Sequence, residues 1–437
     1  MKEQLYYRHM DQIRKKEIFK LLVREFQEAP LPDVIARDLD IPLNGKKIIT
    51  VFGPRRSGKS FYFFGLVKKL LDQGINRKRI VYLSFEDDRV LPLSFKDLDE
   101  LMEAYYELFP ENKKKQIFLF LDEIQNIKNW EIFVRRIYDK EKVKLFITGS
   151  SSKLLSREIA TSLRGRTLSF PLYPLNFREF LRFMGENPDE NFVYSTRRFN
   201  LNKLLEKFIR FGGFPEVVLE KNSSLKRSIL KEYFDSLVYR DLAERFSIEN
   251  TELLKEMLKY FFTNIASHFS INGYHKSIKQ TIPSSRATIH AYIGHIKETG
   301  YFSFLPLFSY SLKEQRVNPE KIISLDTGLR NRIAFSFSKD TGKLAENLVG
   351  NILARQEKTL FYWENKREVD FVLNNNGDLT AVNVSYGSII EKRELESLVE
   401  FSKKFRNVKS LVLITKDLDE TRGKIKLIPL SKWLLEK

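Results

Sequence analysis

One eight-residue pattern constrains this chain more than any other feature. It has the spacing G-x-x-x-x-G-K-[ST] and consists of Gly53, Pro54, Arg55, Arg56, Ser57, Gly58, Lys59 and Ser60. A predicted strand at 48–52 precedes it, and a predicted helix begins near Lys59. In that context backbone N–H groups surround phosphate oxygens, and the helix N-terminus adds partial positive charge. The sequence therefore predicts a nucleoside triphosphate site in which Lys59 reaches the β- and γ-phosphates and Ser60 binds Mg²⁺.

An acidic pair supplies the second half of the predicted site. Residues 117–121 are five consecutive apolar residues, which is typical of a parallel strand buried on both faces, and Asp122 and Glu123 follow them. We expect Asp122 to hold Mg²⁺ through water. We expect Glu123 to orient or deprotonate the attacking water. A separate glutamate favours ATP hydrolysis by a water that the chain itself holds, rather than a GTPase switch.

Further polar residues follow the next predicted strands. Thr148 ends the predicted strand at 143–148 and Ser150 follows two residues later, and either hydroxyl can contact the γ-phosphate or the attacking water. The alternative for both is ordinary turn chemistry at a strand end. Arg164 and Arg166 flank Gly165 and are candidate arginine fingers, acting within the chain or on a neighbour. The alternative for both arginines is a solvated surface.

Strands and helices alternate through the first half of the chain. The predicted strands lie near 48–52, 79–85, 115–121, 143–148 and 167–172. This alternation predicts an α/β fold with a parallel sheet and helices on both faces. A strand lies between the P-loop strand and the Asp-Glu strand, as in the branch of P-loop ATPases with an added strand and a catalytic glutamate. Residues up to about Gln27 are predicted to be helical.

Composition narrows the partners and the compartment. The formal net charge is +18, from 75 Lys plus Arg against 57 Asp plus Glu. This excess favours a polyanionic partner, nucleic acid first and an acidic membrane surface second, with surface solvation as the alternative. Cysteine is absent, which excludes disulfides and Cys-ligated zinc. No apolar run reaches the roughly 18 residues of a membrane span and the first residues lack a signal-peptide core, so we expect a cytoplasmic protein.

Several motifs recur in a characteristic order. They are the P-loop at 53–60, Leu-Asp-Glu-Ile-Gln at 121–125, Ile-Thr-Gly-Ser-Ser at 147–151, Leu-Arg-Gly-Arg at 163–166, Pro-Leu-Asn-Phe-Arg-Glu-Phe at 174–180 and Gly-Gly-Phe-Pro-Glu at 212–216. From about residue 45 onward the chain resembles the archaeal and bacterial AAA+-type ATPases that carry a C-terminal winged helix and a restriction-endonuclease-like domain. The resemblance implies ATP hydrolysis.

The segment 251–325 has the features of a winged helix. Ser284 and Ser285 are helix N-caps, Gly300 is a C-terminal stop, and isoleucines at 289, 293 and 296 form one apolar stripe. Three basic side chains lie beside that stripe and are predicted to contact DNA: Arg286, His290 and Lys297. Residues 301–305 and 308–310 flank Pro306 as two wing strands would. The alternative is a winged helix used for protein contacts alone.

The C-terminal segment departs from the nuclease pattern. Glu346 on a helix and Asp370 on a strand occupy two of its carboxylate positions. On the next strand Asn383 replaces the second carboxylate and Ser385 replaces the lysine that assists water. Lys392 is the displaced lysine that would have to compensate. We predict that the domain keeps the restriction-endonuclease-like fold and has lost nuclease activity.

These observations combine into one prediction. The expected division is an N-terminal helical segment at 1–46, a P-loop ATPase core at 47–175, a helical lid at 176–250, a winged helix at 251–325 and a nuclease-like domain at 326–437. The expected function is Mg²⁺-dependent ATP hydrolysis of the AAA+ type, coupled to binding of double-stranded DNA. The alternatives are a protein-interaction or signalling ATPase with incidental DNA binding, and an active Mg²⁺-dependent nuclease. A protein partner and a homo-oligomer remain among the expected assemblies.

Overall fold

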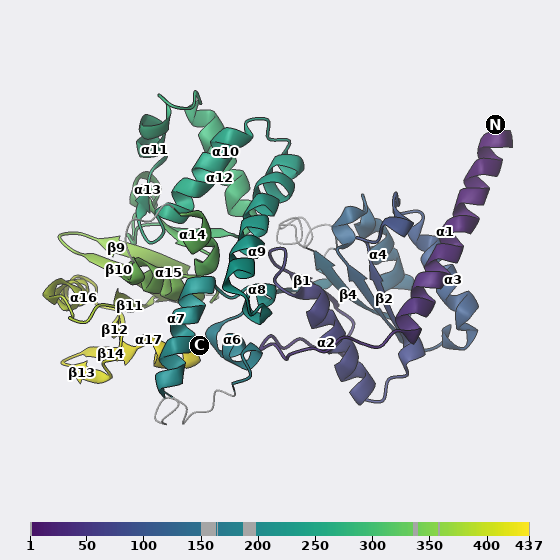
Figure 1. Ribbon diagram of the computed structural model, residues 1–437, viewed down its shortest axis with the longest axis horizontal. Coiled ribbons are helices and arrows are strands. Elements are labelled where there is room, and N and C mark those ends of the chain that lie inside the picture. Colours follow the sequence, from purple (N-terminus) through teal and green to yellow (C-terminus); the bar gives the residue numbers. More distant parts are fainter. Residues whose placement is uncertain are drawn as a thin grey trace. The chain divides into compact units, whose positions relative to one another are not determined.

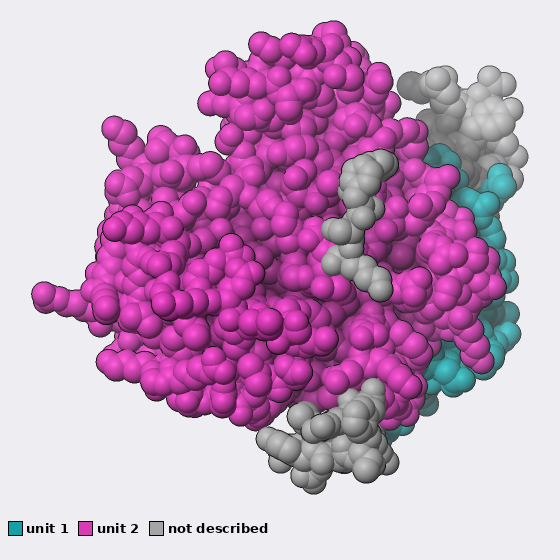
Figure 2. Space-filling model, turned by 60° about the vertical axis from the view of Figure 1, so that its left-hand side comes forward, with its two compact units in different colours: residues 1–173 teal, residues 174–437 magenta. Residues whose placement is uncertain are grey.

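The chain forms two compact units, residues 1–173 and 174–437 (Figure 2). The computed structural model describes residues 2–149, 163, 165–186, 198–334, 340–356 and 359–436. Among these described residues, no helix is both long enough and apolar enough to cross a bilayer.

The first unit is built on a parallel sheet (Figure 1). Its strands are β1 (Ile48–Phe52), β2 (Ile80–Ser84), β3 (Ile117–Asp122), β4 (Val143–Gly149) and β5 (Thr167–Pro171). Their order is β2-β3-β4-β1-β5, and every neighbouring pair is parallel. The predicted α/β fold with a parallel sheet is confirmed. β4 lies between β1 and β3, so the P-loop strand and the Asp-Glu strand are not direct neighbours.

Helices cover both faces of this sheet. They are α1 (Lys2–Glu28), α2 (Lys59–Asp72), α3 (Leu98–Leu108) and α4 (Trp130–Lys140). Successive residues of β3 point to opposite faces: Leu119 joins a buried cluster with α1, α3 and α4, whereas Phe120 joins another with α2. Phe120 stacks on Phe146 of β4 with ring centroids 4.4 Å apart. Burial on both faces explains why β3 is apolar at every position before Asp122.

The second unit begins with helices. They are α6 (Phe177–Phe183), α7 (Arg198–Phe211), α8 (Pro215–Leu219), α9 (Ser223–Ser236), the π-helical stretch η6 (Leu237–Glu244), α10 (Thr251–Thr263), α11 (Ile271–Ile278), α12 (Arg286–Thr299), α13 (Leu312–Val317) and α14 (Thr327–Ile333). The sequence signals for α12 are confirmed. Ser285 accepts a hydrogen bond from Thr288 N, and Gly300 ends the helix with φ 74°.

A small sheet corrects the predicted wing. Its strands β6 (His268–Phe269), β7 (Phe302–Leu305) and β8 (Glu320–Ser324) have the order β6-β8-β7, with antiparallel pairs. The predicted strand at 308–310 is wrong, because β7 pairs with β8 instead. Residues 306–308 turn toward the next sheet, where Phe308 N donates to Tyr362 O at 2.6 Å.

The larger C-terminal sheet is mixed. Its strands are β9 (Thr359–Glu364), β10 (Glu368–Asn375), β11 (Asp378–Ser385), β12 (Val408–Thr415), β13 (Glu420–Arg422) and β14 (Ile425–Pro429). The order is β13-β14-β12-β11-β10-β9; β11, β12 and β14 are parallel, and the outer pairs are antiparallel. The three helices that accompany it are α15 (Thr341–Ala354), α16 (Lys392–Lys404) and α17 (Leu430–Leu435).

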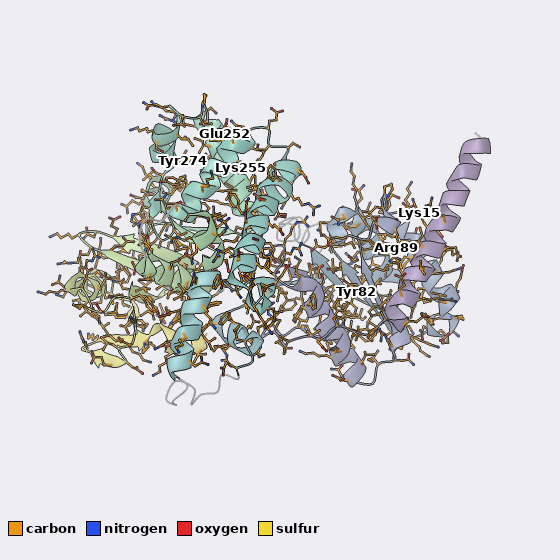
Figure 3. The ribbon with its side chains drawn as sticks, in the orientation of Figure 1. Lys15, Tyr82, Arg89, Glu252, Lys255 and Tyr274 are labelled. Atoms are coloured by element: carbon orange, nitrogen blue, oxygen red, sulfur yellow. The ribbon has the colours of Figure 1, made fainter. Side chains whose placement is uncertain are left out.

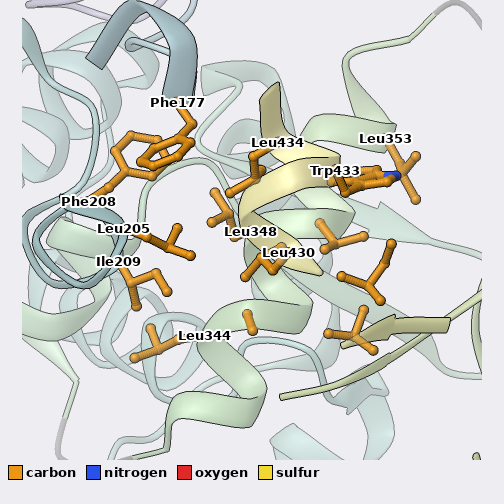
Figure 4. Close-up of a cluster of buried hydrophobic side chains, with 14 of the residues drawn as sticks. Phe177, Leu205, Phe208, Ile209, Leu344, Leu348, Leu353, Leu430, Trp433 and Leu434 are labelled. Carbon is orange, nitrogen blue, oxygen red and sulfur yellow. The ribbon is translucent and has the colours of Figure 1, made fainter. Parts of the chain in front are cut away.

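The core of the second unit lies on one face of this sheet. Figure 4 shows side chains of α6, α7, α15 and α17 meeting there, among them Phe177, Phe208, Leu348 and Trp433. The opposite face packs against α16 through a second buried cluster that includes Phe401. Both faces of the sheet carry apolar side chains because helices pack against both of them.

The Gly-Gly-Phe-Pro motif has a structural explanation. Gly212 has φ 76°, and a Cβ there would lie 2.2 Å from the Asp326 carboxylate. A Cβ on Gly213 would lie 2.3 Å from Leu175 O. A backbone hydrogen bond also joins these two residues, because Leu175 N donates to Gly213 O at 2.7 Å. The two glycines therefore let the loop between α7 and α8 pack closely against the Leu175 backbone and the Asp326 side chain, which precedes α14.

Candidate functional site

The P-loop connects β1 to α2 at the carboxyl edge of the parallel sheet. A Cβ on Gly53 would lie 2.1 Å from Leu172 O, so only glycine allows this close approach. Gly58 precedes α2 with φ 92°, a conformation that favours glycine, and provides no side-chain cap for the helix. The first-turn N–H groups of α2 thus have no cap from that residue, which suits an anionic ligand.

Lys59 lies inside this loop. Its side chain is buried, and Nζ donates to Gly53 O at 3.3 Å and to Pro54 O at 3.2 Å. The Ser57 hydroxyl is buried without a hydrogen-bond partner in the described part of the chain. A loop with a buried ammonium, an unsatisfied hydroxyl and an uncapped helix start fits the phosphates of a nucleotide.

Arg37 supports the loop and was not predicted. Its two terminal nitrogens donate to Ser57 O at 3.0 Å and to Tyr173 O at 2.7 Å. The guanidinium therefore holds the P-loop to the segment that follows β5. Nothing in the sequence indicates this, because Arg37 is a single arginine in a proline-containing segment far from the motif.

The acidic pair is buried at the end of β3, next to Thr148 of β4. The Thr148 hydroxyl donates to Asp122 Oδ1 and accepts a hydrogen bond from Glu123 N at 3.0 Å. A hydroxyl has one hydrogen, so Thr148 here binds the acidic pair rather than offering a donor to a ligand. The predicted contact between Thr148 and phosphate or water stays a prediction. Ser150, the alternative, lies outside the described residues.

Glu123 has a strained backbone conformation, and its carboxylate is held by two neighbouring side chains. Its backbone is left-handed (φ 52°, ψ 43°), which costs about 1 kcal/mol for a residue with a side chain. Gln125 Nε2 donates to Glu123 Oε2, and Lys59 Nζ lies 3.3 Å from Oε1. Both carboxylate oxygens are thereby fixed, one of them against the P-loop lysine. Strain of this kind is concentrated at functional sites.

Tyr82 is a second residue that the sequence did not indicate. Figure 3 labels Tyr82, which lies on β2 beside β3. Its hydroxyl donates to Asp122 Oδ2 at 2.7 Å. Burial and the neighbouring Asp122 carboxylate raise the pKa of Tyr82, so it remains a donor. Tyr82 therefore supports Asp122, one of the two predicted metal ligands.

We expect Tyr82→Phe to weaken the use of Mg²⁺. The Asp122 carboxylate would lose a charge-assisted hydrogen bond, and such supporting contacts typically change metal affinity or activity by about 10- to 100-fold. The Mg²⁺ concentration for half-maximal ATP turnover should rise about tenfold, and Mn²⁺ affinity in the presence of ATP should fall to match. Tyr105→Phe is the matched control, because Tyr105 donates to Lys78 O at 2.8 Å away from the site. Equal Mg²⁺ dependence in both variants would contradict this role.

Arg166 lies at the opposite end of the sheet from the P-loop. Its carbonyl accepts from Ile48 N at 2.9 Å, at the start of β1, whereas Gly53 follows the end of β1. Five strand residues at about 3.3 Å each separate them by roughly 17 Å, longer than an arginine side chain. The guanidinium instead pairs with Asp139, with both contacts at 3.1 Å. A finger role within its own chain is therefore wrong for Arg166, and Arg164 lies outside the described residues.

The three predicted DNA contacts lie on α12. Arg286 and His290 are exposed, and the isoleucine stripe beside them is buried as predicted. Lys297 is exposed but engaged: its Nζ contacts both Glu320 oxygens, at 2.8 and 2.9 Å, and lies 4.7 Å from the centroid of the Phe304 ring. The sequence missed this pairing because Glu320 is 23 residues away on β8.

The nuclease-type residues come together only in part. Asn383 Oδ1 accepts from Asp370 N at 3.1 Å, and its Nδ2 donates to Ser397 Oγ at 2.8 Å, so the amide has a structural use. Lys392 is 89% exposed and pairs with Glu396 at 3.5 Å, so it does not compensate for the missing lysine. The lysine that does meet Glu346 and Asp370 is Lys321 on β8.

Comparisons with known proteins agree with this geometry. Residues 45–181 match the family described as an AAA domain, and the domains of unknown function DUF8612 and DUF4143 match residues 202–340 and 341–433. The chain is 36% identical to the uncharacterized protein MJ1544 of Methanocaldococcus jannaschii, covering 97% of this chain and 96% of that protein. It is 27% identical to an uncharacterized protein of Haemophilus influenzae, covering 89% and 94%.

Among solved structures, the Walker-type ATPase PABY2304 of Pyrococcus abyssi covers 73% of this chain and 95% of its own length. The identity is 10% and the TM-score 0.43, a likeness too weak to say anything about function. The parallel sheet, the loop around Lys59 and the AAA-domain match define a protein with an AAA-type P-loop ATPase fold. The chain belongs to the same family as MJ1544 of M. jannaschii.

Proposed function

We propose that this chain binds ATP with Mg²⁺ at the P-loop and hydrolyses it. The observation that supports this most directly is the meeting of Lys59 and Glu123, which come from α2 and from the end of β3 with Nζ and Oε1 3.3 Å apart. Hydrolysis needs a phosphate-binding cation and a water-activating base at the same phosphate. Bound Mg²⁺ would supply further positive charge to the phosphate oxygens.

In this proposal each side chain of the site has a separate role. Lys59 and the first N–H groups of α2 bind phosphate oxygens, while Ser60 and Asp122 hold the metal. Before ATP binds, Lys59 and Glu123 neutralise each other in a buried place. When Lys59 turns to a phosphate, Glu123 Oε1 becomes able to accept a proton from water, and Gln125 keeps Oε2 in position. Thr148 fixes Asp122 and Glu123 relative to each other.

Phosphate release by the purified chain tests this proposal. Turnover should require Mg²⁺ and should stop in EDTA. Turnover that continues in EDTA would contradict the metal requirement. If Arg166 serves as a finger at all, it does so on a neighbouring chain, so specific activity should then rise with protein concentration as a homo-oligomer forms.

We further propose that ATP state is coupled to double-stranded DNA, with residues 251–325 as a winged helix. The net charge of +18 and the exposed Arg286 and His290 on a well-capped helix support a polyanionic partner. The domain at 326–437 is proposed to be nuclease-like and inactive. The division of the chain into core, lid, winged helix and nuclease-like domain stays a prediction, as does the cytoplasmic location.

DNA affinity should fall steeply with salt. Without Lys297, which is paired with Glu320, two phosphate contacts correspond to a slope of about −1.8 in log K against log salt, so affinity should weaken about 12-fold between 50 and 200 mM salt. Arg286→Ala should reduce the slope by about 0.9. Lys297→Ala should reduce it less, because Lys297 is already paired with Glu320. Fluorescence anisotropy with a labelled duplex measures both, and an affinity unchanged over this range would count against DNA.

A protein-interaction ATPase is the second candidate function. The pairing of Lys297 with Glu320 favours it, because it removes one of the three predicted phosphate contacts. In that case a protein partner should be recovered by pull-down from nuclease-treated lysate, and ATP turnover should be indifferent to duplex DNA.

A further inference from the structure

A buried lysine and three half-buried carboxylates form a cluster in the second unit. Lys321 of β8 has a side-chain exposure of 1%. Its Nζ contacts Glu346 of α15, lies 2.8 Å from Glu368 Oε1 of β10 and lies 3.4 Å from Asp370 Oδ1 of the same strand. One oxygen of each carboxylate lies within 4.8 Å of the others, the spacing of a metal site. We name these four residues the Lys321 cluster.

The ammonium occupies the centre of the Lys321 cluster. A divalent ion bound by the same three oxygens would need distances of about 2.0–2.6 Å to each and would have to share that space with a positive charge. Like charges at that separation repel strongly in a buried place. Burial alone would lower the pKa of Lys321, but the negative charges of Glu346, Asp370 and Glu368 outweigh this effect and raise it. The residues present therefore do not fit the Mg²⁺ that a restriction-type nuclease requires.

The remaining oxygen of Asp370 is also in use. Val384 N donates to Asp370 Oδ2 at 2.8 Å, and Asp370 N donates to Asn383 Oδ1 at 3.1 Å. On the other side of the cluster, His268 Nε2 of β6 lies 3.4 Å from Glu368 Oε1. Both Asp370 oxygens are thus engaged from within the protein, one near the ammonium and one by a backbone amide, and Glu368 has an imidazole nearby.

The strand that carries Lys321 is anchored beside the larger sheet. Tyr362 N of β9 donates to Pro306 O at 3.2 Å, and the Tyr362 hydroxyl donates to Pro319 O at 2.6 Å. These bonds hold both ends of the segment 306–319, which leads into β8. The packing of the small sheet against the larger one therefore places Lys321 beside the three carboxylates.

We propose that Lys321 has replaced the metal: its ammonium is the resident cation of a former nuclease-type site. The cluster now joins β8 of the small sheet to β10 and α15. This goes beyond the predicted loss of nuclease activity, because it names the residue that excludes the metal. It also explains how a lysine can be present although Ser385 stands at the position where the nuclease pattern has one. The proposal does not depend on ATP hydrolysis.

Removal of the ammonium should open the site to a divalent ion. The probe is Mn²⁺ without nucleotide, followed by electron paramagnetic resonance, in full-length protein that carries Asp122→Asn to remove the predicted P-loop metal ligand. The parent should bind no Mn²⁺ that depends on Asp370. Lys321→Ala should bind one additional Mn²⁺, with an affinity at least tenfold higher than that of any Mn²⁺ bound by the parent. Adding Asp370→Asn should abolish this additional binding. Lys297→Ala, which removes a surface lysine beside Glu320, is the control and should gain nothing.

Three outcomes would overturn the proposal. One is Mn²⁺ binding by the parent that Asp370→Asn abolishes, or Mn²⁺-dependent cutting of plasmid DNA that the same change stops. Another is a folded Lys321→Ala or Lys321→Met that binds no more Mn²⁺ than the parent. The third is that both lysine variants fail to fold with and without Mn²⁺, because a divalent ion then cannot take the place of the ammonium. A variant that folds only when Mn²⁺ is present would support the proposal.

Discussion

Glu123→Gln should bind ATP and turn it over about 10²- to 10⁴-fold more slowly, the range expected for loss of a general base. Glutamine has the same shape, so it can keep the left-handed turn and the contact with Gln125. Its amide cannot accept a proton from water. The change also removes the carboxylate that holds Lys59 at 3.3 Å, so affinity for ATP should rise rather than fall.

Single-turnover hydrolysis and equilibrium ATP binding separate these effects. Glu111→Gln makes the same chemical change at an exposed residue of the first unit and should leave both quantities unchanged. Turnover in Glu123→Gln within threefold of the parent would remove Glu123 as the catalytic base. Loss of ATP binding in that variant would show instead that Glu123 has a structural role.

Lys59→Ala should abolish detectable ATP binding, with affinity lower by at least about 100-fold. Lys59 is 5% exposed and bound to two P-loop carbonyls, so its ammonium is already positioned for phosphate oxygens. Its removal takes away the phosphate-binding cation. It also leaves Glu123 buried without its ion-pair partner, and an uncompensated buried carboxylate repels a polyphosphate.

A fluorescent ATP analogue titrated into each variant measures this loss. Lys69→Ala is the control on the same helix, because Lys69 is 56% exposed and lies 3.8 Å from Asp40, away from the loop. ATP affinity in Lys59→Ala within threefold of the parent would place the nucleotide somewhere other than the P-loop. Thermal unfolding of both variants shows whether the first unit remains folded.

The parts of the fold that the sequence predicted depend on local patterns. β3 was predictable because five apolar residues before an acidic pair indicate a strand buried on both faces. α12 was predictable because Ser285 and Gly300 mark its ends and the isoleucines give its period. The P-loop was predictable because its glycines meet backbone requirements that no other residue meets, as Gly53 against Leu172 O shows.

The contacts that complete each site come from residues distant in sequence. Tyr82 meets Asp122 only because β2 pairs with β3, and Arg37 meets the P-loop from a segment without regular structure. Arg166 is placed at the far end of the sheet by the parallel direction of β5. No pattern along the chain carries that information, because it follows from strand order and tertiary packing.

The Lys321 cluster illustrates the same limit. Placing the second wing strand at 308–310 left residues 320–324 unassigned, so the lysine was not recognised as buried. In β8 it lies on the same face as Ile323, which is also buried, whereas Glu320 on the other face reaches Lys297. The correct strand register would have indicated a buried lysine, and a buried lysine requires carboxylate partners.

We propose that this chain is an ATPase whose turnover responds to DNA. This is tested by measuring phosphate release at physiological salt, with and without duplex DNA. The rate of the Glu123→Gln variant serves as the baseline. We predict Mg²⁺-dependent turnover well above that baseline and stimulation by the duplex. Turnover equal to Glu123→Gln under both conditions would contradict ATP hydrolysis, and turnover indifferent to DNA would contradict the coupling.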